Sequence, residues 1–131
     1  MKKILCITPV KHLDGVFDLF KYYGKPIYKP NISKENLRNL LLSSDIEYIF
    51  TNPNKQGFIL GKDILEGSSV KVINTCSTGT NHLDKKYCLK NKIEVWSLTK
   101  DMELINDLPS TSELAFGLMC SLFRKINPGF E

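Results

Sequence analysis

Arginine is scarce in this chain of 131 residues: it occurs only at Arg38 and Arg124, so lysine carries nearly all of the positive charge. Recognition of phosphates and bases usually depends on the bidentate fork of arginine, and the lysines are dispersed rather than clustered. The formal net charge of +4 therefore does not predict a nucleic-acid partner. Apolar runs are also short, well below the about 18 residues that a membrane-spanning helix requires. We expect neither nucleic acid nor membrane among the partners.

Paired cysteines are absent as well. The four cysteines are widely scattered, at Cys6, Cys76, Cys88 and Cys120. They form no CxxC pair and have no histidine at zinc-finger spacing, so we expect reduced structural thiols, no metal site and a cytoplasmic location. The start of the chain, MKKILCITPV, looks like a secretory signal, but Pro9 and Lys11 interrupt its apolar run and no small-residue cleavage site follows. It is predicted to form a buried strand.

What is present is the composition of one ordinary globular domain. Hydrophobic residues make up 42% and charged residues 24% of the chain, so it is neither disordered nor fibrous. Short apolar runs alternate with segments of helical periodicity, which predicts an α/β fold with a doubly wound, five-stranded parallel sheet. The predicted strands are residues 4–8, 26–29, 47–50, 70–75 and 93–96. The predicted helices are residues 13–23, a helix capped by Ser33, residues 62–66 and residues 84–90.

The C-terminal part is predicted to differ from this pattern. Residues 97–109 are expected to be an irregular linker or hinge, because neighbouring elements of a compact domain need a shorter connection. Ser110 and Glu113 have the spacing of a helix capping box, and the helix is predicted to continue through Arg124. Apolar residues cover both of its faces: Leu114, Ala115, Phe116, Leu118, Met119, Leu122, Phe123 and Ile126. Two interpretations stay open, a core helix of this domain or a helix that packs against a partner.

Polar loops follow the predicted first, third and fourth strands. In open α/β sheets, ligands bind beyond the carboxyl ends of the strands. These ends carry Thr8 and Pro9, then residues 51–55, then residues 76–81 with the sequence CSTGTN. The third loop is small, polar and hinged on Gly79, so its backbone N–H groups can hold a carboxylate or phosphate. The alternative is an ordinary strand-to-helix turn, with Gly79 at positive φ and Asn81 as the helix N-cap.

Several enzyme classes lack the residues they require. A receiver domain needs acidic residues where this chain has Thr8 and Thr51. A cysteine phosphatase needs an arginine six positions after its cysteine, and His82 stands there after Cys76, which we interpret as a structural thiol. The only other histidine is His12, and His82 is interpreted as a surface or capping residue rather than a catalyst. No two glycines lie two positions apart, so the GxGxxG dinucleotide fingerprint is absent.

Two blocks in the second half of the chain resemble a known family. The first block is VKVINTCSTGTNHLDKKYCLKNKIEVWS, and it resembles the substrate-domain signature of the D-isomer-specific 2-hydroxyacid dehydrogenases. In that signature, a strand is followed by a glycine-containing loop, the motif D-x-x-D, a helix and a short strand. The block LPSTSELAFGLMCSLFRKI is similar to the helix that opens the family's cofactor domain. The resemblance covers about residues 45–126 and preserves the order and spacing of both blocks. It implies a flavodoxin-like sheet, followed by the first helix of a Rossmann domain that this chain does not contain.

The resemblance also implies roles for individual residues. The residues matched to substrate contacts are Ser77, Thr78 and Gly79, through their main-chain N–H groups, and Asn52 and Asn54 in the loop after the third strand. Thr111 matches the family's threonine beside the nicotinamide. The chain departs from the family pattern at Asn81, where aspartate is usual, at Ser112, where alanine is usual, and at Thr51. Members acting on phosphoglycerate often have arginine in place of Thr51, so this departure argues against a phosphorylated substrate.

The function implied is that of the substrate-binding part of an NAD(P)-dependent oxidoreductase acting on the CH–OH group of a D-2-hydroxy acid. The family's catalytic arginine, glutamate and histidine follow the last helix of this chain, so we predict no catalytic residue here. We expect residues 1–109 to form the substrate-binding domain, residues 110–131 to begin the cofactor domain, and the chain alone to bind no NAD or NADP and to be inactive. A homodimer through the helix from Ser110 to Ile126 is expected. The alternative function is a non-catalytic α/β binding or interaction module.

Overall fold

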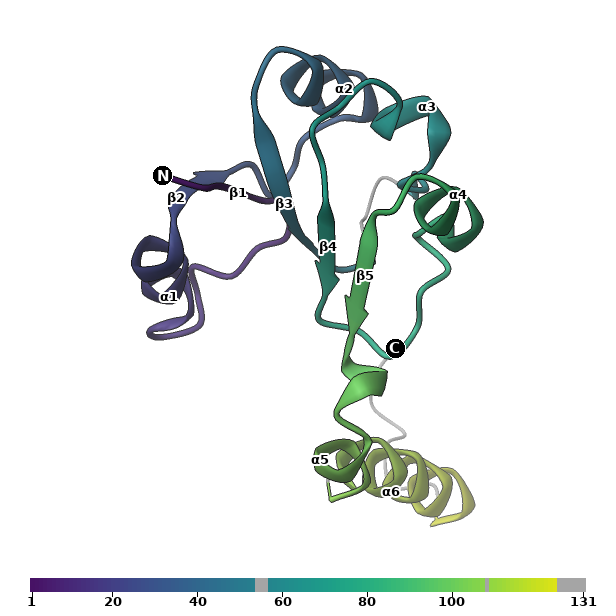
Figure 1. Cartoon of the computed structure of the whole chain (residues 1–131). Helices are drawn as coiled ribbons and strands as arrows, with labels where there is room; N and C mark the ends of the chain where they lie inside the picture. Colours follow the sequence, from purple (N-terminus) through teal and green to yellow (C-terminus); the bar gives the residue numbers. More distant parts are fainter. Residues whose placement is uncertain (54–56, 108, 125–131) are drawn as a thin grey trace. The chain divides into compact units, whose positions relative to one another are not determined.

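Five parallel strands form one sheet in the order β2-β1-β3-β4-β5 (Figure 1). The computed structural model describes residues 1–53, 57–107 and 109–124. The strands are β1 (Lys3–Cys6), β2 (Lys25–Tyr28), β3 (Ile46–Thr51), β4 (Val72–Thr75) and β5 (Glu94–Ser97). Every pairing of neighbouring strands is parallel, and β1 lies between β2 and β3. The predicted flavodoxin-like, five-stranded parallel sheet is confirmed.

Helices connect the successive strands. They are α1 (Val16–Tyr23), α2 (Lys34–Leu42), α3 (Lys62–Leu65) and α4 (Lys85–Lys90). The hydroxyl Oγ of Ser33 accepts a hydrogen bond from the N–H of Asn36 at 3.3 Å, which confirms the predicted N-cap of α2. Helix α1 begins three residues later than predicted, because Gly15 has a φ of 75° and belongs to a turn before the helix.

The hydrophobic core lies on one face of the sheet. The register pairs Leu5 with Ile49 and Ile49 with Ile73, and paired residues of parallel strands point to the same face. All three are at most 2% exposed. The other buried members of this core on the helices are Leu37 and Leu41 of α2, Ile64 and Leu65 of α3, and Cys88 of α4. Since this core fixes β3 and β4 rigidly, it also fixes the loops that leave their carboxyl ends.

The opposite face of the sheet is only partly covered. Helix α1 packs there through Phe20, whose ring lies 5.0 Å from that of Phe50 in β3. Beyond it, Asn74 of β4 is exposed and the Trp96 side chain of β5 is 45% exposed. A largely apolar groove of about 430 Å³ runs over this face from α1 to Trp96. The sheet therefore has one fully packed face and one face with exposed apolar side chains.

The segment after β5 is more regular than predicted. It contains a 3₁₀ turn (Leu98–Lys100) and helix α5 (Met102–Asn106), so the expectation that residues 97–109 are irregular is wrong, while their role as a linker or hinge stays a prediction. The last helix, α6, spans Ser110–Arg124, and the N–H of Glu113 donates to the carbonyl of Pro109 at 2.9 Å. Ser110 thus lies inside the helix rather than at its N-cap. The chain divides into two compact units, Met1–Lys100 and Asp101–Glu131.

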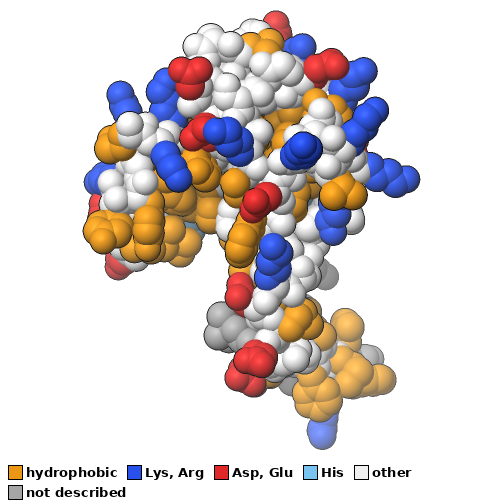
Figure 2. All heavy atoms as spheres, in the orientation of Figure 1, with side chains coloured by type: hydrophobic (Ala, Val, Ile, Leu, Met, Phe, Trp, Pro, Cys, Tyr) orange, Lys and Arg blue, Asp and Glu red, His pale blue; other side chains and the backbone are white. Residues whose placement is uncertain are grey.

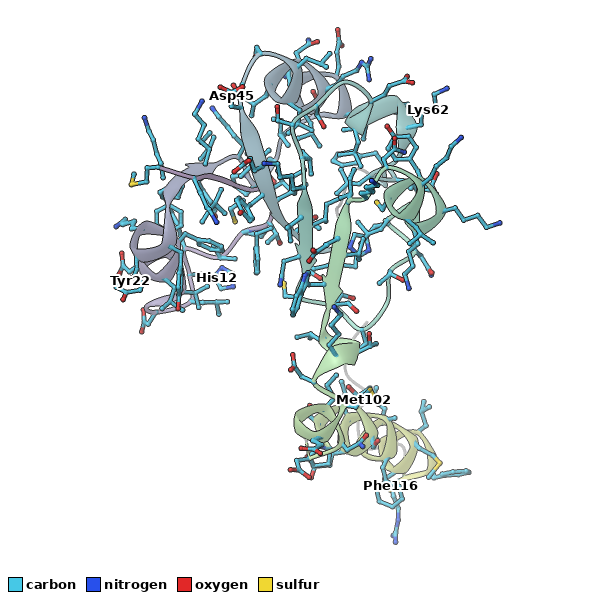
Figure 3. All side chains as sticks on the ribbon, viewed as in Figure 1. His12, Tyr22, Asp45, Lys62, Met102 and Phe116 are labelled. Atoms are coloured by element: carbon cyan, nitrogen blue, oxygen red, sulfur yellow. The ribbon has the colours of Figure 1, made fainter. Side chains whose placement is uncertain are left out.

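Helix α6 leaves its apolar side chains exposed. The C-terminal unit holds only α5 and α6 among its described residues, too little chain to enclose a core, and no side chain of α6 is buried. The exposed fractions reach 64% at Phe116 and 81% at Phe123. Hydrophobic side chains gather on the surface of this helix (Figure 2), and Phe116 projects away from its axis (Figure 3). Ile126 lies outside the described residues.

Candidate functional site

Strands β3 and β4 end at the same level of the sheet. Thr51 pairs with Thr75 as the last residue of each strand, and these side chains are 0% and 1% exposed. The N–H of Cys76 donates to the carbonyl of Thr51 at 3.2 Å, so the two strand ends are hydrogen-bonded to each other. The hydroxyl of Thr51 donates to the carbonyl of Asn52 at 3.0 Å. The loops that begin at Asn52 and Cys76 therefore leave the sheet side by side.

A buried hydrogen bond closes the base of the loop after β4. Oγ1 of Thr75, at its start, lies 2.9 Å from Nε2 of His82, at its end. His82 is 8% exposed, so the interpretation of this histidine as a surface or capping residue is wrong. Helix α4 is capped instead by Asp84, whose Oδ1 accepts from the N–H of Tyr87 at 2.9 Å. The Thr75–His82 bond holds the intervening residues as a closed loop ahead of the helix.

The backbone N–H groups of this loop have no acceptor among the described residues. No N–H from Ser77 to His82 donates to an acceptor within the described part of the chain, whereas two carbonyls of the loop do accept. The carbonyl of Ser77 accepts from Leu98 at 3.3 Å, and that of Thr80 accepts from Leu83 at 3.0 Å. Thr78 and Gly79 are exposed. Polar N–H groups held by a fixed loop are suited to an anion such as a carboxylate.

Gly79 does not adopt the conformation of the ordinary turn that was the alternative interpretation. Positive φ values occur at other glycines, and Asn81 is not the N-cap of α4, so both parts of that alternative are wrong. A Cβ added at Gly79 would meet only Oγ of Ser77, at 3.8 Å. The space in front of this backbone is open, which lets a ligand approach it closely.

A cavity of about 330 Å³ lies beside the loop. Gly79, Asn81 and His82 form one wall. The other wall comes from the segment after β3, with Pro53, Gly57, Phe58 and Ile59. A short bridge brings the two walls together: the N–H of Leu60 donates to the carbonyl of His82 at 2.9 Å, and the N–H of Asp84 donates to the carbonyl of Leu60 at 3.0 Å.

Six residues that line the cavity were not predicted as site residues from the sequence: Pro53, Gly57, Phe58, Ile59, Asn81 and His82. The bridge at Leu60 joins segments that are far apart in the chain, and no periodic pattern or turn motif marks it. Only the glycines at 57 and 61, which flank FIL, hinted at a constrained segment. The loop residues could be found because they directly follow a strand, whereas the opposite wall depends on tertiary structure.

Burial favours the neutral forms of His82 and Cys76. It lowers the pKa of His82 below the ordinary value, so the imidazole is uncharged at neutral pH. It raises the pKa of the Cys76 thiol, which disfavours the thiolate and agrees with the interpretation of Cys76 as a structural residue. Among its described residues, the site thus offers neutral hydrogen-bonding groups and an apolar wall, without a carboxylate or an ammonium group.

The predicted site residues fall into three groups. Ser77, Thr78 and Gly79 lie together in the loop after β4, and Asn52 starts the neighbouring loop. Asn54 lies outside the described residues. Thr111 is exposed on α6, in the C-terminal unit. Within residues 1–53, 57–107 and 109–124, no cluster of three or more histidine, cysteine or acidic side chains has the arrangement of a metal site. Over the same residues, no helix has the length and apolar character needed to cross a membrane.

Comparison with known proteins identifies the fold. No family model and no curated protein matches the sequence. Among solved structures, the chain is similar to D-mandelate dehydrogenase from Rhodotorula graminis, with a TM-score of 0.67 and 21% identity over 95% of this chain and 38% of that one. It is also similar to a glyoxylate reductase from Paecilomyes thermophila, with a TM-score of 0.63 and 16% identity over 73% of this chain and 31% of that one.

A third similar structure was solved with a cofactor. It is an acyclic imino acid reductase in complex with NADPH and D-Arg, with a TM-score of 0.58 and 23% identity over 72% of this chain and 30% of that one. The chain spans about a third of the length of these structures. These dehydrogenases and reductases share the fold of this chain, and that agreement supports the family resemblance found in its sequence.

Proposed function

We propose that this chain is the substrate-binding part of an NAD(P)-dependent oxidoreductase related to the D-isomer-specific 2-hydroxyacid dehydrogenases. The reaction is the interconversion of a small 2-keto acid and its D-2-hydroxy acid. The observation that carries the proposal is the loop from Ser77 to His82, whose N–H groups have no acceptor among the described residues and which lines a cavity through Gly79, Asn81 and His82. The fold is shared with D-mandelate dehydrogenase and glyoxylate reductase, which act on acids of this class according to their names.

The contribution of the chain to such a reaction is orientation of the substrate. The N–H groups of Ser77, Thr78 and Gly79 hold the carboxylate, and each donates a hydrogen bond to a carboxylate oxygen. Because the Thr75–His82 bond and the core fix the loop beforehand, little ordering remains to be done when the substrate binds. The apolar wall that includes Phe58 lies next to the side chain that the substrate acid carries on its C2 atom.

The residues of this chain do not by themselves make a dinucleotide site. A tightly bound pyrophosphate needs a glycine-rich turn at a helix N-terminus, and the sequence has no GxGxxG. Thr111 is a single candidate contact. We therefore place the cofactor site and the acid–base residues of the reaction outside this chain, and expect the chain alone to bind NADH negligibly and to reduce no keto acid.

The proposal is tested by titrating the chain with pyruvate while its amide NMR spectrum is recorded. The expected result is a saturable shift of the N–H signals of Ser77, Thr78 and Gly79. Pyruvamide, which has the same shape and no charge, is the matched control and should shift these signals much less. Equal shifts with both compounds would reject the carboxylate site. Oxidation of NADH by the chain with any 2-keto acid would reject the partial-enzyme interpretation.

A second candidate function is a non-catalytic binding module. The observation in its favour is that the described cavity walls hold neutral donors and no charged acid or base. The coding sequence that follows Glu131 distinguishes the two functions. A GxGxxG motif downstream supports the dehydrogenase, and a stop codon combined with retained pyruvate binding supports the module.

A further inference from the structure

Strand β5 is an edge strand with outward-facing backbone groups. Among the described strands, its only neighbour in the sheet is β4. The N–H of Glu94 donates to the carbonyl of Lys71 at 2.8 Å, on the β4 side. In a parallel strand without a bulge, successive residues direct their N–H and C=O groups alternately to either side, and the β4–β5 register is unbroken. The N–H and C=O of Val95 therefore point away from the sheet.

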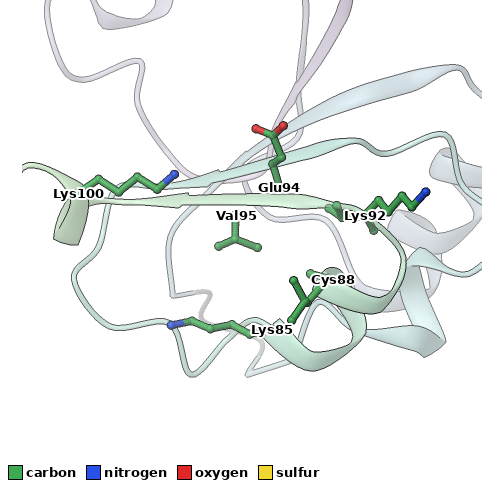
Figure 4. A pocket seen from close by; sticks show the side chains of 8 residues that line it. Lys85, Cys88, Lys92, Glu94, Val95 and Lys100 are labelled. Atoms are coloured by element: carbon green, nitrogen blue, oxygen red, sulfur yellow. The ribbon is translucent and has the colours of Figure 1, made fainter.

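A groove of about 570 Å³ runs along this open edge. Figure 4 shows Val95 of β5 facing helix α4, with Cys88 and Lys85 of that helix opposite it. The aliphatic side chains of Ile93 and Val95 line the groove together with Leu89, which is 82% exposed although it belongs to the helix that packs beside β5. The edge thus combines backbone hydrogen-bonding groups with an apolar channel beside them.

The rim of the groove is positively charged. Lys85, Lys92 and Lys100 lie around it, and none forms an ion pair with another described residue. Glu94 is the one carboxylate in its lining among the described residues, and its Oε2 accepts a hydrogen bond from Nε1 of Trp96 at 3.1 Å. Three ammonium groups against one carboxylate favour an acidic ligand at this edge.

We propose that the β5 groove binds an extended acidic segment of a partner protein, which adds to the sheet as a further strand. The backbone of that segment exchanges hydrogen bonds with the N–H and C=O of Val95. Its acidic side chains meet Lys85, Lys92 and Lys100, and its apolar side chains enter the channel beside Leu89. The four residues of β5 offer about 13 Å of edge, enough for four or five residues of such a segment.

A purely protective role of the lysines, or the binding of a small anion, would use only part of this edge. Lysines often protect an edge strand from pairing, but protection does not require a hollow lined by Ile93 and Val95 or an exposed Leu89. A small anion would satisfy the lysines and leave the outward groups of Val95 without a partner. An extended peptide uses the lysines, the channel and the backbone together.

The test uses a blocked peptide of alternating valine and glutamate, titrated into the full chain. Trp96 is the only tryptophan and lies in β5 with Nζ of Lys100 3.8 Å from the centre of its ring, so its fluorescence reports on this edge. Saturable binding is expected, with at least a tenfold lower affinity for the peptide in which lysine replaces glutamate. Equal affinity for both peptides, or no binding of either, would overturn the proposal.

Two variants locate the binding. Lys85→Glu with Lys92→Glu should weaken binding of the acidic peptide at least tenfold. The control Lys86→Glu with Lys90→Glu makes the same charge change at two lysines of α4 that do not line the groove, and should weaken binding less than threefold. Val95→Pro removes the outward N–H without removing a hydrogen bond to β4, which a strand edge tolerates, and should abolish strand addition. Equal effects of the two double variants would overturn the site. Inorganic phosphate that displaces the peptide fully at equal concentration would show a simple anion site instead.

Discussion

Gly79 combines an unstrained backbone with an open approach to the loop. Alanine at this position needs no unusual φ, and its Cβ would make only an ordinary contact with Ser77. We expect Gly79→Ala to leave the thermal midpoint nearly unchanged. The added methyl group stands where the carboxylate approaches the backbone, so pyruvate affinity should fall about tenfold, or about 1.4 kcal/mol. Calorimetric titration and a melting curve measure the two effects.

Gly117→Ala is the matched control for this variant. A Cβ at Gly117 meets nothing within 4 Å, and the residue lies in α6 rather than in the loop. Pyruvate affinity should be unchanged, while α6 gains up to about 1 kcal/mol of helix stability. Unchanged affinity in Gly79→Ala would contradict the placement of the carboxylate at the loop backbone.

His82 makes stability depend on pH in a defined direction. Its folded-state pKa is lowered by burial, whereas in the unfolded chain it returns to about 6.5. Below that pH the unfolded chain binds a proton that the folded chain does not, so the free energy of unfolding decreases as pH falls towards the folded-state pKa. His82→Gln can keep a hydrogen bond to Thr75 without titrating, and should flatten the decrease in the free energy of unfolding that begins near the unfolded-state pKa of about 6.5.

Chemical denaturation at several pH values measures the effect of His82. His12→Gln serves as the control, because His12 is exposed and outside the site. This variant should keep the pH dependence of the parent chain. The assignment of this pH dependence to His82 fails if His12→Gln and His82→Gln reduce the pH dependence of the free energy of unfolding equally.

At the scale of single elements, α6 is the helix with most apolar surface left to bury. Phe116 and Phe123 are 64% and 81% exposed. We expect the chain to form a homodimer through α6, since paired helices would remove these side chains from water. Phe116→Ser with Phe123→Ser should weaken the dimer at least tenfold in analytical ultracentrifugation, by the loss of about 1.5 kcal/mol or more of apolar burial.

Tyr22→Ser tests whether this effect belongs to α6. Tyr22 is 82% exposed on α1, so its replacement removes a comparable aromatic side chain from a different element. The dimer should persist in this variant. A parent chain that stays monomeric at the highest soluble concentration would refute the prediction.

The strands were predictable because each contains a short apolar stretch bounded by polar or turn residues. Helix α4 was predicted at nearly its true position, but its cap was not, since Asn81 and Asp84 are both capable N-caps. The bridge between Leu60 and Leu83 holds Leu83 outside the helix, so α4 begins only after Asp84. The same bridge supplies the second wall of the candidate site. The local sequence thus predicted the loop after β4, whereas the wall opposite it, from the segment after β3, is defined only by the tertiary structure.

At the scale of the whole molecule, the two units should differ in their ability to fold without the other unit. The buried core is contained in residues 1–100, and the described residues of the C-terminal unit contribute no member of it. A chain that ends at Lys100 should therefore keep a cooperative thermal transition and the circular dichroism of the α/β sheet. A chain that ends at Asn91 lacks β5 and the buried Ile93, and should lose that transition. Loss of cooperativity in both chains would show that the sheet depends on the C-terminal unit.

The interior position of β1 has a consequence for synthesis on the ribosome. The first of these five strands to be synthesised needs two neighbours, and β2 and then β3 arrive to flank it. From β3 onwards, the order of translation equals the order across the sheet, so each nascent strand meets the exposed edge of its predecessor. Assembly can proceed outwards in step with elongation, without waiting for a late segment to be inserted between strands already joined.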